Sequence, residues 1–391
     1  MKFYQKALYL LAIGVTSNMH SQSKKPEKPK ISIGGALRFN YNFSSWKAGQ
    51  KKRGGDFGFD MFRINTKADY KDLKLNVEYR FYSEDFGGGM LKQGWIGYDF
   101  SKNTNLQIGL TQVPFGITQY NSHNWFFGIN YYVGLEDDHD MGIKYTHKNG
   151  NWEYALAFFK NSEELRFGNN SDISNSRYSY DVASIDLDGN GSLDIRNKEI
   201  NQFNVKINYL IEASKAKHKL GVSAQYGGLY NLDTEKNGNH LAMAAHYELN
   251  IAQFDAKAQV SFYEYNTENL KKEPDNIIAM TAYGAPYLVA SKATTYTFGV
   301  GYVIPIKRKM ISSIQIYNDF GYIDKAVKNF NDSMMNVLGV LINSGNVYTY
   351  IDVASGKNQP WLGPVWTNAL ADGSINAKWE TRFNINIGYY F

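Results

Sequence analysis

The last segment of the chain alternates apolar and polar residues without a break. One face of this segment carries Ile385, Ile387, Tyr389 and Phe391, and the other carries Asn384, Asn386, Gly388 and Tyr390. Strict alternation with a period of two predicts a strand with one apolar and one wet face. The same alternation recurs along most of the chain, which predicts an all-β protein.

The alternation predicts sixteen strands, most of them joined in pairs by short polar turns such as Lys71-Asp72 and Asn149-Gly150. The predicted strands are Ile31–Phe43, Asp60–Tyr70, Leu73–Tyr82, Met90–Phe100, Asn105–Val113, His139–Lys148, Asn151–Lys160, Gln202–Ile211, His218–Tyr230, His240–Ile251, Phe254–Asn266, Thr294–Ile306, Ile311–Ile323, Asn336–Ile342, Val347–Ala354 and Ile375–Phe391. The number falls to 14 if the short hairpin within 336–354 is part of a loop. Either even number places both chain ends at the same rim.

The longer connections all fall at the opposite rim. They are Ser44–Phe59, Pro114–Asp138, Asn161–Asn201, Thr267–Ala293, Asp324–Met335 and Ser355–Ser374. Short turns at one rim and long loops at the other are typical of a transmembrane antiparallel β-barrel of a bacterial outer membrane. A soluble β-sandwich or lectin also alternates, but strands of ten or more residues favour the barrel.

Composition supports this interpretation. Aromatic residues make up 15% of the 391 residues, while the mean hydropathy is only -0.44. Strands with a lipid face, a wet face and aromatic girdles would produce that combination. An apolar run of about 18 residues is absent outside the N-terminal region, which argues against membrane-spanning helices. The chain has no Cys, which excludes disulfides and thiol chemistry.

The N-terminal region is typical of an export signal. Lys2 and Lys6 precede an apolar stretch, and small residues follow at Ser21-Gln22-Ser23. We therefore expect a signal peptide at 1–23, a basic periplasmic leader at 24–30 and an outer-membrane barrel domain at 31–391, in contact with the lipid bilayer. The signal and the leader carry the whole formal charge of +5, so the barrel has no basic excess to attract nucleic acid.

The polar face of each predicted strand must point into the barrel, because lipid cannot solvate charge. A basic stripe then follows the first three strands and the last one, and consists of Arg38, Arg63, Lys67, Lys74, Arg80 and Arg382. One interpretation is a pore-lining track for phosphate-like or carboxylate anions. The alternative is a solvated wall whose charges pair across strands and select nothing strongly.

The segment Gln112-Val113-Pro114-Phe115-Gly116 interrupts a strand with a proline bend. It resembles the phosphate-selective porin O and P family of bacterial outer membranes, as do the strand spacing and the terminal Gly388-Tyr389-Tyr390-Phe391. The resemblance implies a 16-stranded barrel, a homotrimer, passage of small anionic solutes, and a constriction loop that folds into the barrel. Here that loop would include Pro114, Phe115, Gly116 and Trp125; the alternative is an exposed loop tip.

The loop Pro114–Asp138 departs from what phosphate selectivity requires. It contains no Lys or Arg and ends in Glu136-Asp137-Asp138. A general, non-selective porin of the same fold therefore stays open as an alternative.

One segment, residues 186–194, resembles the helix-free calcium loops of secreted proteins. Oxygen ligands would come from Asp186, Asp188, Asn190, Ser192 and Asp194. A calcium ion there would be structural, and no other cofactor is expected. The alternative is a polar loop without metal.

Two further functional classes compete with a porin. A hydrolase barrel would need a nucleophile and a base, but the chain contains neither a Gly-x-Ser-x-Gly nor a His-Glu-x-x-His motif. An outer-membrane scaffold or adhesin would use the long loops without an open pore. We therefore expect a non-enzymatic channel.

Overall fold

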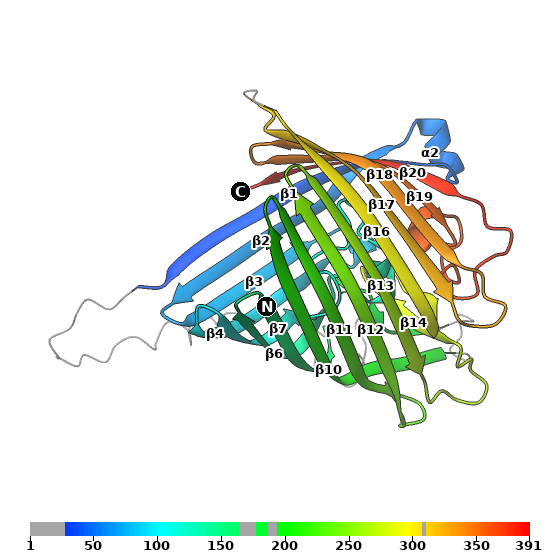
Figure 1. Cartoon of the computed structure of the whole chain (residues 1–391). Coiled ribbons are helices and arrows are strands. Elements are labelled where there is room, and N and C mark those ends of the chain that lie inside the picture. Colours follow the sequence, from blue (N-terminus) through cyan, green and yellow to red (C-terminus); the bar gives the residue numbers. More distant parts are fainter. Residues whose placement is uncertain (1–27, 164–176, 187–193, 307–309) are drawn as a thin grey trace, which may run out of the picture.

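The computed structural model describes residues 28–163, 177–186, 194–306 and 310–391. Sixteen antiparallel strands close into a single barrel (Figure 1). They are β1 (Lys30–Ser44), β2 (Asp56–Tyr70), β3 (Leu73–Phe81), β4 (Gly89–Ser101), β5 (Thr104–Gln112), β6 (His139–Asn149), β7 (Trp152–Ser162), β10 (Asp194–Ala213), β11 (Ala216–Asn231), β12 (Asn237–Ile251), β13 (Phe254–Asn266), β16 (Lys292–Pro305), β17 (Ser313–Lys325), β18 (Ser333–Ser344), β19 (Val347–Lys357) and β20 (Glu380–Tyr390).

The first and last strands pair and close the barrel. In that pairing Arg38 lies opposite Gly388 and Ser44 lies opposite Arg382. The backbone of Gly35 also exchanges two hydrogen bonds with Phe391. Closure leaves the sheet without an open edge, which a barrel in lipid requires because hydrocarbon cannot satisfy free backbone groups.

The two faces of the barrel wall differ as the alternation predicts. Large apolar side chains such as Ile96, Phe203 and Phe298 are more than half exposed on the outside. Their neighbours along the strands, such as Lys206 and Thr297, point inward and are buried. The exterior thus has the apolar surface that contact with lipid demands.

The structure confirms the sixteen-strand prediction and contradicts the lower number. β18 and β19 are full-length wall strands of 12 and 11 residues, because their ladders continue beyond the predicted hairpin on both sides. β10 begins eight residues earlier than predicted, and β20 begins at Glu380 instead of Ile375. The predicted signal peptide and most of the predicted leader lie outside the described residues.

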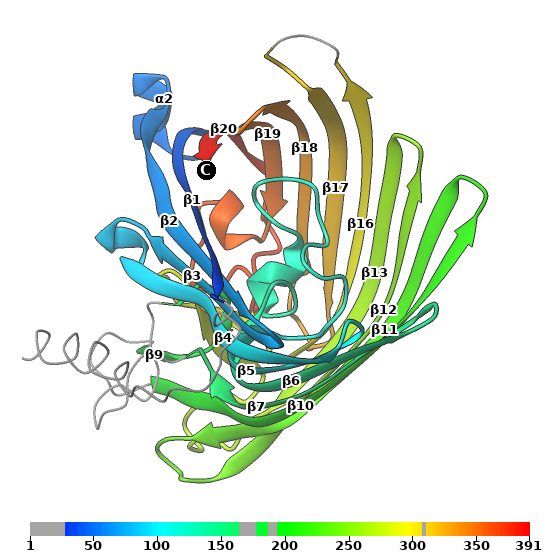
Figure 2. The ribbon, with the colours of Figure 1, turned by 90° about the vertical axis from the view of Figure 1, so that its left-hand side faces the viewer.

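Several short elements accompany the barrel. The small helices are α2 (Ala48–Arg53), η1 (Glu84–Phe86), η2 (Ile129–Val133) and η3 (Pro360–Leu362). A separate sheet joins β8 (Asp181–Val182), β14 (Ile277–Thr281) and β15 (Tyr287–Ala290), while β9 (Ser184–Asp186) pairs with the start of β10. Figure 2 shows η2 and η3 inside the barrel, where residues of η2 and of the small sheet form one buried cluster.

Among the described residues, no helix is both long and apolar enough to span a membrane.

Candidate functional site: the infolded loop and the basic wall

The segment between β5 and β6 crosses the barrel interior; we call it the infolded loop, Val113–Asp138. Its backbone N–H groups bond to the opposite wall: Gly116 donates to Ser223 Oγ at 2.9 Å, and Ile117 donates to Gln259 Oε1 at 2.7 Å. Gly116 has a φ of +53°, and a Cβ there would lie 2.4 Å from Gln259 Oε1. Glycine is therefore required where the loop meets the wall.

A second anchor clamps the middle of the infolded loop. His123 donates its backbone N–H to Asp319 at 2.8 Å, its ring Nδ1 lies 2.7 Å from the same carboxylate, and its Nε2 meets Asp255. Lys257 donates to the carbonyls of Tyr120 and Ser122, at 3.2 Å each. Burial lowers the pKa of His123, but its bonds to both carboxylates outweigh burial and raise that pKa above the ordinary value.

The aromatic side chains of the loop are packed rather than exposed. Phe127 stacks on Tyr131 with ring centroids 4.2 Å apart, and Tyr132 donates its hydroxyl to the carbonyl of Phe126 at 2.7 Å. Pro114, Phe115 and Gly116 are buried, and Trp125 is partly buried. The four residues predicted for the constriction therefore lie inside the barrel, and the exposed-tip alternative is wrong.

The Glu136 side chain stabilises the backbone of the infolded loop. Its carboxylate accepts the backbone N–H groups of Asn121 and Gly128, at 3.0 and 3.1 Å. Burial raises the pKa of Glu136 to about 8, while these bonds act in the opposite direction.

All six residues of the predicted basic stripe lie on the polar face of their strands. Lys74 lies opposite Asp69, beside the Lys71-Asp72 turn at the rim that carries the chain ends. Arg382 lies opposite Ser44, at the rim of the long loops. Between them, Lys67 pairs with Asn76, Arg63 with Arg80, and Arg38 with Gly388. The stripe thus extends from one rim to the other.

Acidic side chains pair with four of these six residues. Arg38 lies 2.7 Å from Asp60, and Lys74 lies 2.8 Å from Asp69 and 3.5 Å from Asp99. Glu78 accepts from Arg80 at 2.6 Å and from Arg63 at 3.3 Å. The sequence had left open whether the charges pair across strands. Arg38, Arg63 and Lys74 do so, whereas Arg80 pairs with Glu78 on its own strand.

Arg382 and Lys67 differ from the other four. Within the described part of the chain, neither has a carboxylate within ion-pair distance. Arg382 donates from Nε to Ser44 Oγ at 3.3 Å, and its guanidinium lies 5.5 Å from the ring centre of Trp46. Lys67 is exposed.

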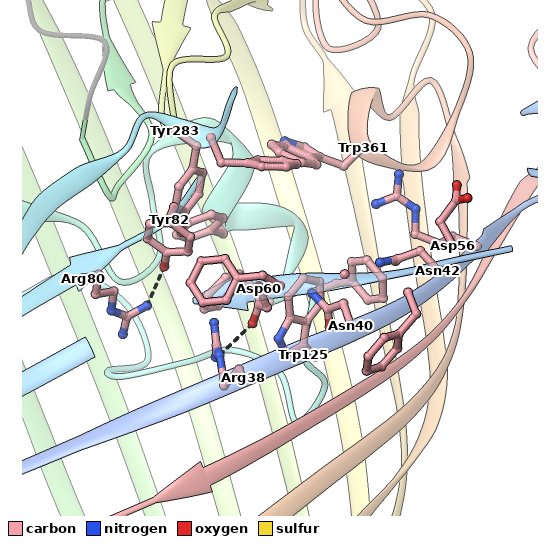
Figure 3. A pocket seen from close by; sticks show the side chains of 18 of the residues that line it. Arg38, Asn40, Asn42, Asp56, Asp60, Arg80, Tyr82, Trp125, Tyr283 and Trp361 are labelled. Carbon is pink, nitrogen blue, oxygen red and sulfur yellow. Dashed lines mark hydrogen bonds and ion pairs between the residues drawn. The ribbon is translucent and has the colours of Figure 1, made fainter. Parts of the chain in front are cut away.

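Three arginines of the stripe line one cavity of about 290 Å³ (Figure 3). They are Arg38, Arg80 and Arg382, which come from three different strands. Aromatic rings from the infolded loop and from other loops form much of the remaining wall, among them Trp125, Tyr131, Tyr132, Tyr180, Tyr283 and Trp361. Guanidinium donors beside aromatic faces can bind a solute that has an anionic group and a flat or apolar part.

The other side of the infolded loop borders a second cavity of about 370 Å³. Lys144 donates to the carbonyl of Gln112 at 2.8 Å, and Lys206 donates to Thr118 Oγ1 at 3.0 Å. Both lysines line this cavity together with Pro114. Basic side chains therefore occur on both sides of the loop.

The alternation of residues did not identify Lys92 as a cation of the barrel interior. Lys92 is 4% exposed and lies 2.6 Å from Asp137 at the end of the infolded loop. The β3–β4 register shifts between Glu78 and Tyr79, which lie opposite Gln93 and Leu91. This bulge changes the inward parity along β4 beside Lys92, so period-two counting alone could not place it.

Of the predicted calcium loop, the structure describes the two ends. Asp186 and Asp194 lie opposite each other where β9 pairs with β10. Asp188, Asn190 and Ser192 lie outside the described residues.

The barrel is similar to solved structures of outer-membrane proteins. The trimer form of OmpT from Vibrio cholerae has a TM-score of 0.55 at 13% identity, covering 93% of this chain and 100% of that chain. An anion-selective porin from Comamonas acidovorans has a TM-score of 0.55 at 12% identity, covering 93% and 100%. The outer membrane channel DcaP of Acinetobacter baumannii has a TM-score of 0.57 at 9% identity, covering 93% and 97%.

No family model and no curated protein matches the sequence. At such low identities the structural likeness establishes the fold, a β-barrel of the bacterial outer-membrane type. The narrower resemblance to the phosphate-selective O and P family stays a prediction.

Proposed function

We propose that this chain is an outer-membrane porin, a water-filled channel through which small anionic or polar solutes diffuse passively. The observation that carries the proposal is the gathering of Arg38, Arg80 and Arg382 on one cavity beside the infolded loop. Solved barrels of the same fold include an anion-selective porin and an outer membrane channel, which supports a channel function.

The charges of the site suit passage better than tight binding. A channel must attract its solute strongly enough to admit it and weakly enough to release it. Arg38 and Arg80 keep carboxylate partners, so they offer only part of their hydrogen-bonding capacity to a passing anion. Arg382, at the rim of the long loops, has Ser44 and Trp46 as its neighbours and would meet an incoming anion first.

The solute remains a proposal at the level of chemical class. Phosphate is one candidate, because arginine suits bidentate contact with oxyanions. The aromatic walls of the cavity favour a small organic anion at least equally. A general porin of the same fold is the second candidate, because the infolded loop contains no Lys or Arg and ends in three acidic residues.

The remaining expectations from the sequence belong to the same proposal. We propose a signal peptide at 1–23, insertion in the outer-membrane bilayer, and a homotrimer, as in the trimer form of OmpT. We also propose a structural calcium ion in the segment 186–194. We propose no catalytic role for the barrel.

Single-channel conductance in a planar bilayer tests the proposal, with the reversal potential measured under a salt gradient. The proposal expects stable conductance steps with anion selectivity, and Arg382→Gln should shift the reversal potential toward cation preference. Lys217→Gln is the matched control, because Lys217 is exposed at a short turn and should leave the potential unchanged. Inhibition by added phosphate would favour phosphate as the solute.

Two results would contradict it. Cation selectivity of the wild-type channel would contradict the proposed anion track and favour a general porin. Absence of conductance from correctly folded protein would favour the scaffold or hydrolase class.

A further inference from the structure

Three buried carboxylates meet where the infolded loop returns to the wall. They belong to Asp138 at the end of the loop, Asp140 in β6 and Asp181 in β8; we call them the acidic cluster. Their exposed fractions are 8%, 2% and 3%. One oxygen from each lies within 4.8 Å of the others. Such close approach of buried carboxylates is unfavourable unless positive charge compensates it.

The neighbouring Asp137 shows how the chain neutralises a buried acid elsewhere. Its carboxylate lies 2.6 Å from Lys92 and accepts from the Tyr178 hydroxyl at 2.7 Å and from Gln112 at 2.8 Å. The acidic cluster has less compensating positive charge than Asp137. Among the described residues, its one ion pair joins Asp181 to Arg177 at 3.4 Å. Three carboxylates beside one arginine leave an excess of negative charge, which a divalent cation would reduce.

Two more carboxylates increase the negative charge around the cluster. Glu163 accepts the backbone N–H of Ser179 at 2.6 Å, and Ser179 in turn donates its hydroxyl to Glu163 at 3.2 Å. Glu199 lies 4.0 Å from His240 Nδ1. Both acids are buried.

Neutral oxygens from two other strands point to a ligand independently of these charges. Gln202 of β10 is 2% exposed and donates from Nε2 to Asp140 at 3.2 Å, which places its amide at the cluster. Thr281 of β14 is fully buried and lies directly opposite Asp181 in the small sheet, so the two side chains share one face. Among the described residues, Gln202 Oε1, Thr281 Oγ1 and Asp140 Oδ1 have no hydrogen-bond partner.

We propose that Asp138, Asp140 and Asp181 bind one calcium ion, with Gln202 and Thr281 as neutral oxygen ligands. Calcium takes six to eight oxygens at about 2.3–2.6 Å, so ligands on opposite sides of the ion are roughly 4.6–5.2 Å apart. The separation within the acidic cluster fits that span. The donors are all oxygens, which favours a hard cation over zinc or copper.

This site is distinct from the predicted loop at 186–194, and it does not depend on which solute the channel passes. Its ligands come from the end of the infolded loop, from the wall strands β6 and β10, and from the small sheet. An ion shared by these elements would fix the infolded loop at its C-terminal end. Bound calcium would thereby hold the constriction in position.

Calcium titration calorimetry of folded protein, stripped with EDTA in detergent, tests the proposal. Asp188→Ala is introduced throughout to disable the other predicted calcium loop. In this background we expect one calcium ion per chain, and Asp140→Asn should weaken its binding at least about tenfold. Asp352→Asn is the matched control, since Asp352 is a fully buried acid that accepts a hydrogen bond from Tyr317 at 2.6 Å, away from the cluster.

Thr281→Val keeps the test decisive if Asp140→Asn does not fold. This variant replaces a buried, unpartnered hydroxyl with a methyl group of similar size, so a purely structural role predicts no loss of calcium affinity. The proposal expects weaker calcium binding and unchanged stability in EDTA. It is overturned if the Asp188→Ala protein binds no calcium, if Asp140→Asn and Thr281→Val bind as tightly as their background, or if magnesium binds equally well.

Discussion

Lys92 Nζ lies 2.6 Å from Asp137 Oδ2, and this buried ion pair joins strand β4 to the end of the infolded loop. Tyr178 reinforces it: its hydroxyl donates to the same carboxylate oxygen at 2.7 Å, and Lys92 lies 4.4 Å from the centre of its ring. The pair therefore connects three segments that are far apart in the sequence. The position of these segments relative to one another therefore depends on the Asp137 carboxylate, which accepts hydrogen bonds from Lys92, Tyr178 and Gln112.

Replacing Lys92 with methionine should destabilise the folded barrel. The substitution keeps most of the side-chain volume but leaves Asp137 buried without its cation, which costs roughly 3 kcal/mol. The free energy of unfolding in lipid vesicles, from denaturant titration, measures the effect. Lys217→Met at an exposed turn is the control and should change it by less than about 1 kcal/mol. Equal stability of both variants would contradict a structural role for the pair.

The clamp at His123 predicts a pH dependence of stability. A pKa above the ordinary 6.5 means that protonated His123 stabilises the fold. This contribution is complete below pH 6.5 and is lost as the pH rises through the higher folded-state pKa. Wild-type protein should therefore lose stability over that range relative to His123→Gln. The difference in unfolding free energy between the two proteins excludes the contribution of Glu136, which titrates in both. A difference that stays constant across pH would contradict the prediction.

Glu78→Gln should increase anion selectivity. Glu78 now shares its carboxylate between Arg63 and Arg80, at 3.3 and 2.6 Å. Removing its charge leaves both guanidinium groups available to a passing anion, and we expect the anion-to-cation permeability ratio to rise roughly twofold. Reversal potentials under a salt gradient give this ratio. Glu212→Gln, at an exposed turn, should leave the ratio unchanged. An unchanged ratio for Glu78→Gln as well would show that the stripe does not line the conducting path.

Gly116→Ala should loosen the infolded loop. Residue 116 has a φ of +53°, and an added Cβ would lie 2.4 Å from Gln259 Oε1, which accepts the N–H of Ile117. Strain and steric clash together should cost about 2 kcal/mol and increase the current noise of single channels. Gly150→Ala is the matched control, with a φ of +57° but open space around the position of the Cβ. Equal effects at the two positions would exclude the contact with Gln259 as the cause.

The sequence by itself determined the barrel and its two faces. Alternation places Arg38, Arg63 and Arg80 on the wet side of their strands, because a one-residue change of register would expose them to lipid. Pro114 marks the end of a strand, since it cannot donate to a ladder. These are local rules of period and hydrogen bonding, so they can be read from neighbouring residues.

Only the tertiary structure decided which of these charges remain available. Whether Arg63 reaches Glu78 on the neighbouring strand, or Arg382 lies beside Ser44 and Trp46, depends on strand register and on bulges such as the one beside Lys92. The alternation of apolar and polar residues does not determine register. Shifting a strand by two residues keeps each side chain on the same face but places it opposite a different residue of the neighbouring strand. The acidic cluster is a second example: Asp181 and Thr281 are 100 positions apart in the chain and lie opposite each other only because the loops fold into a closed barrel.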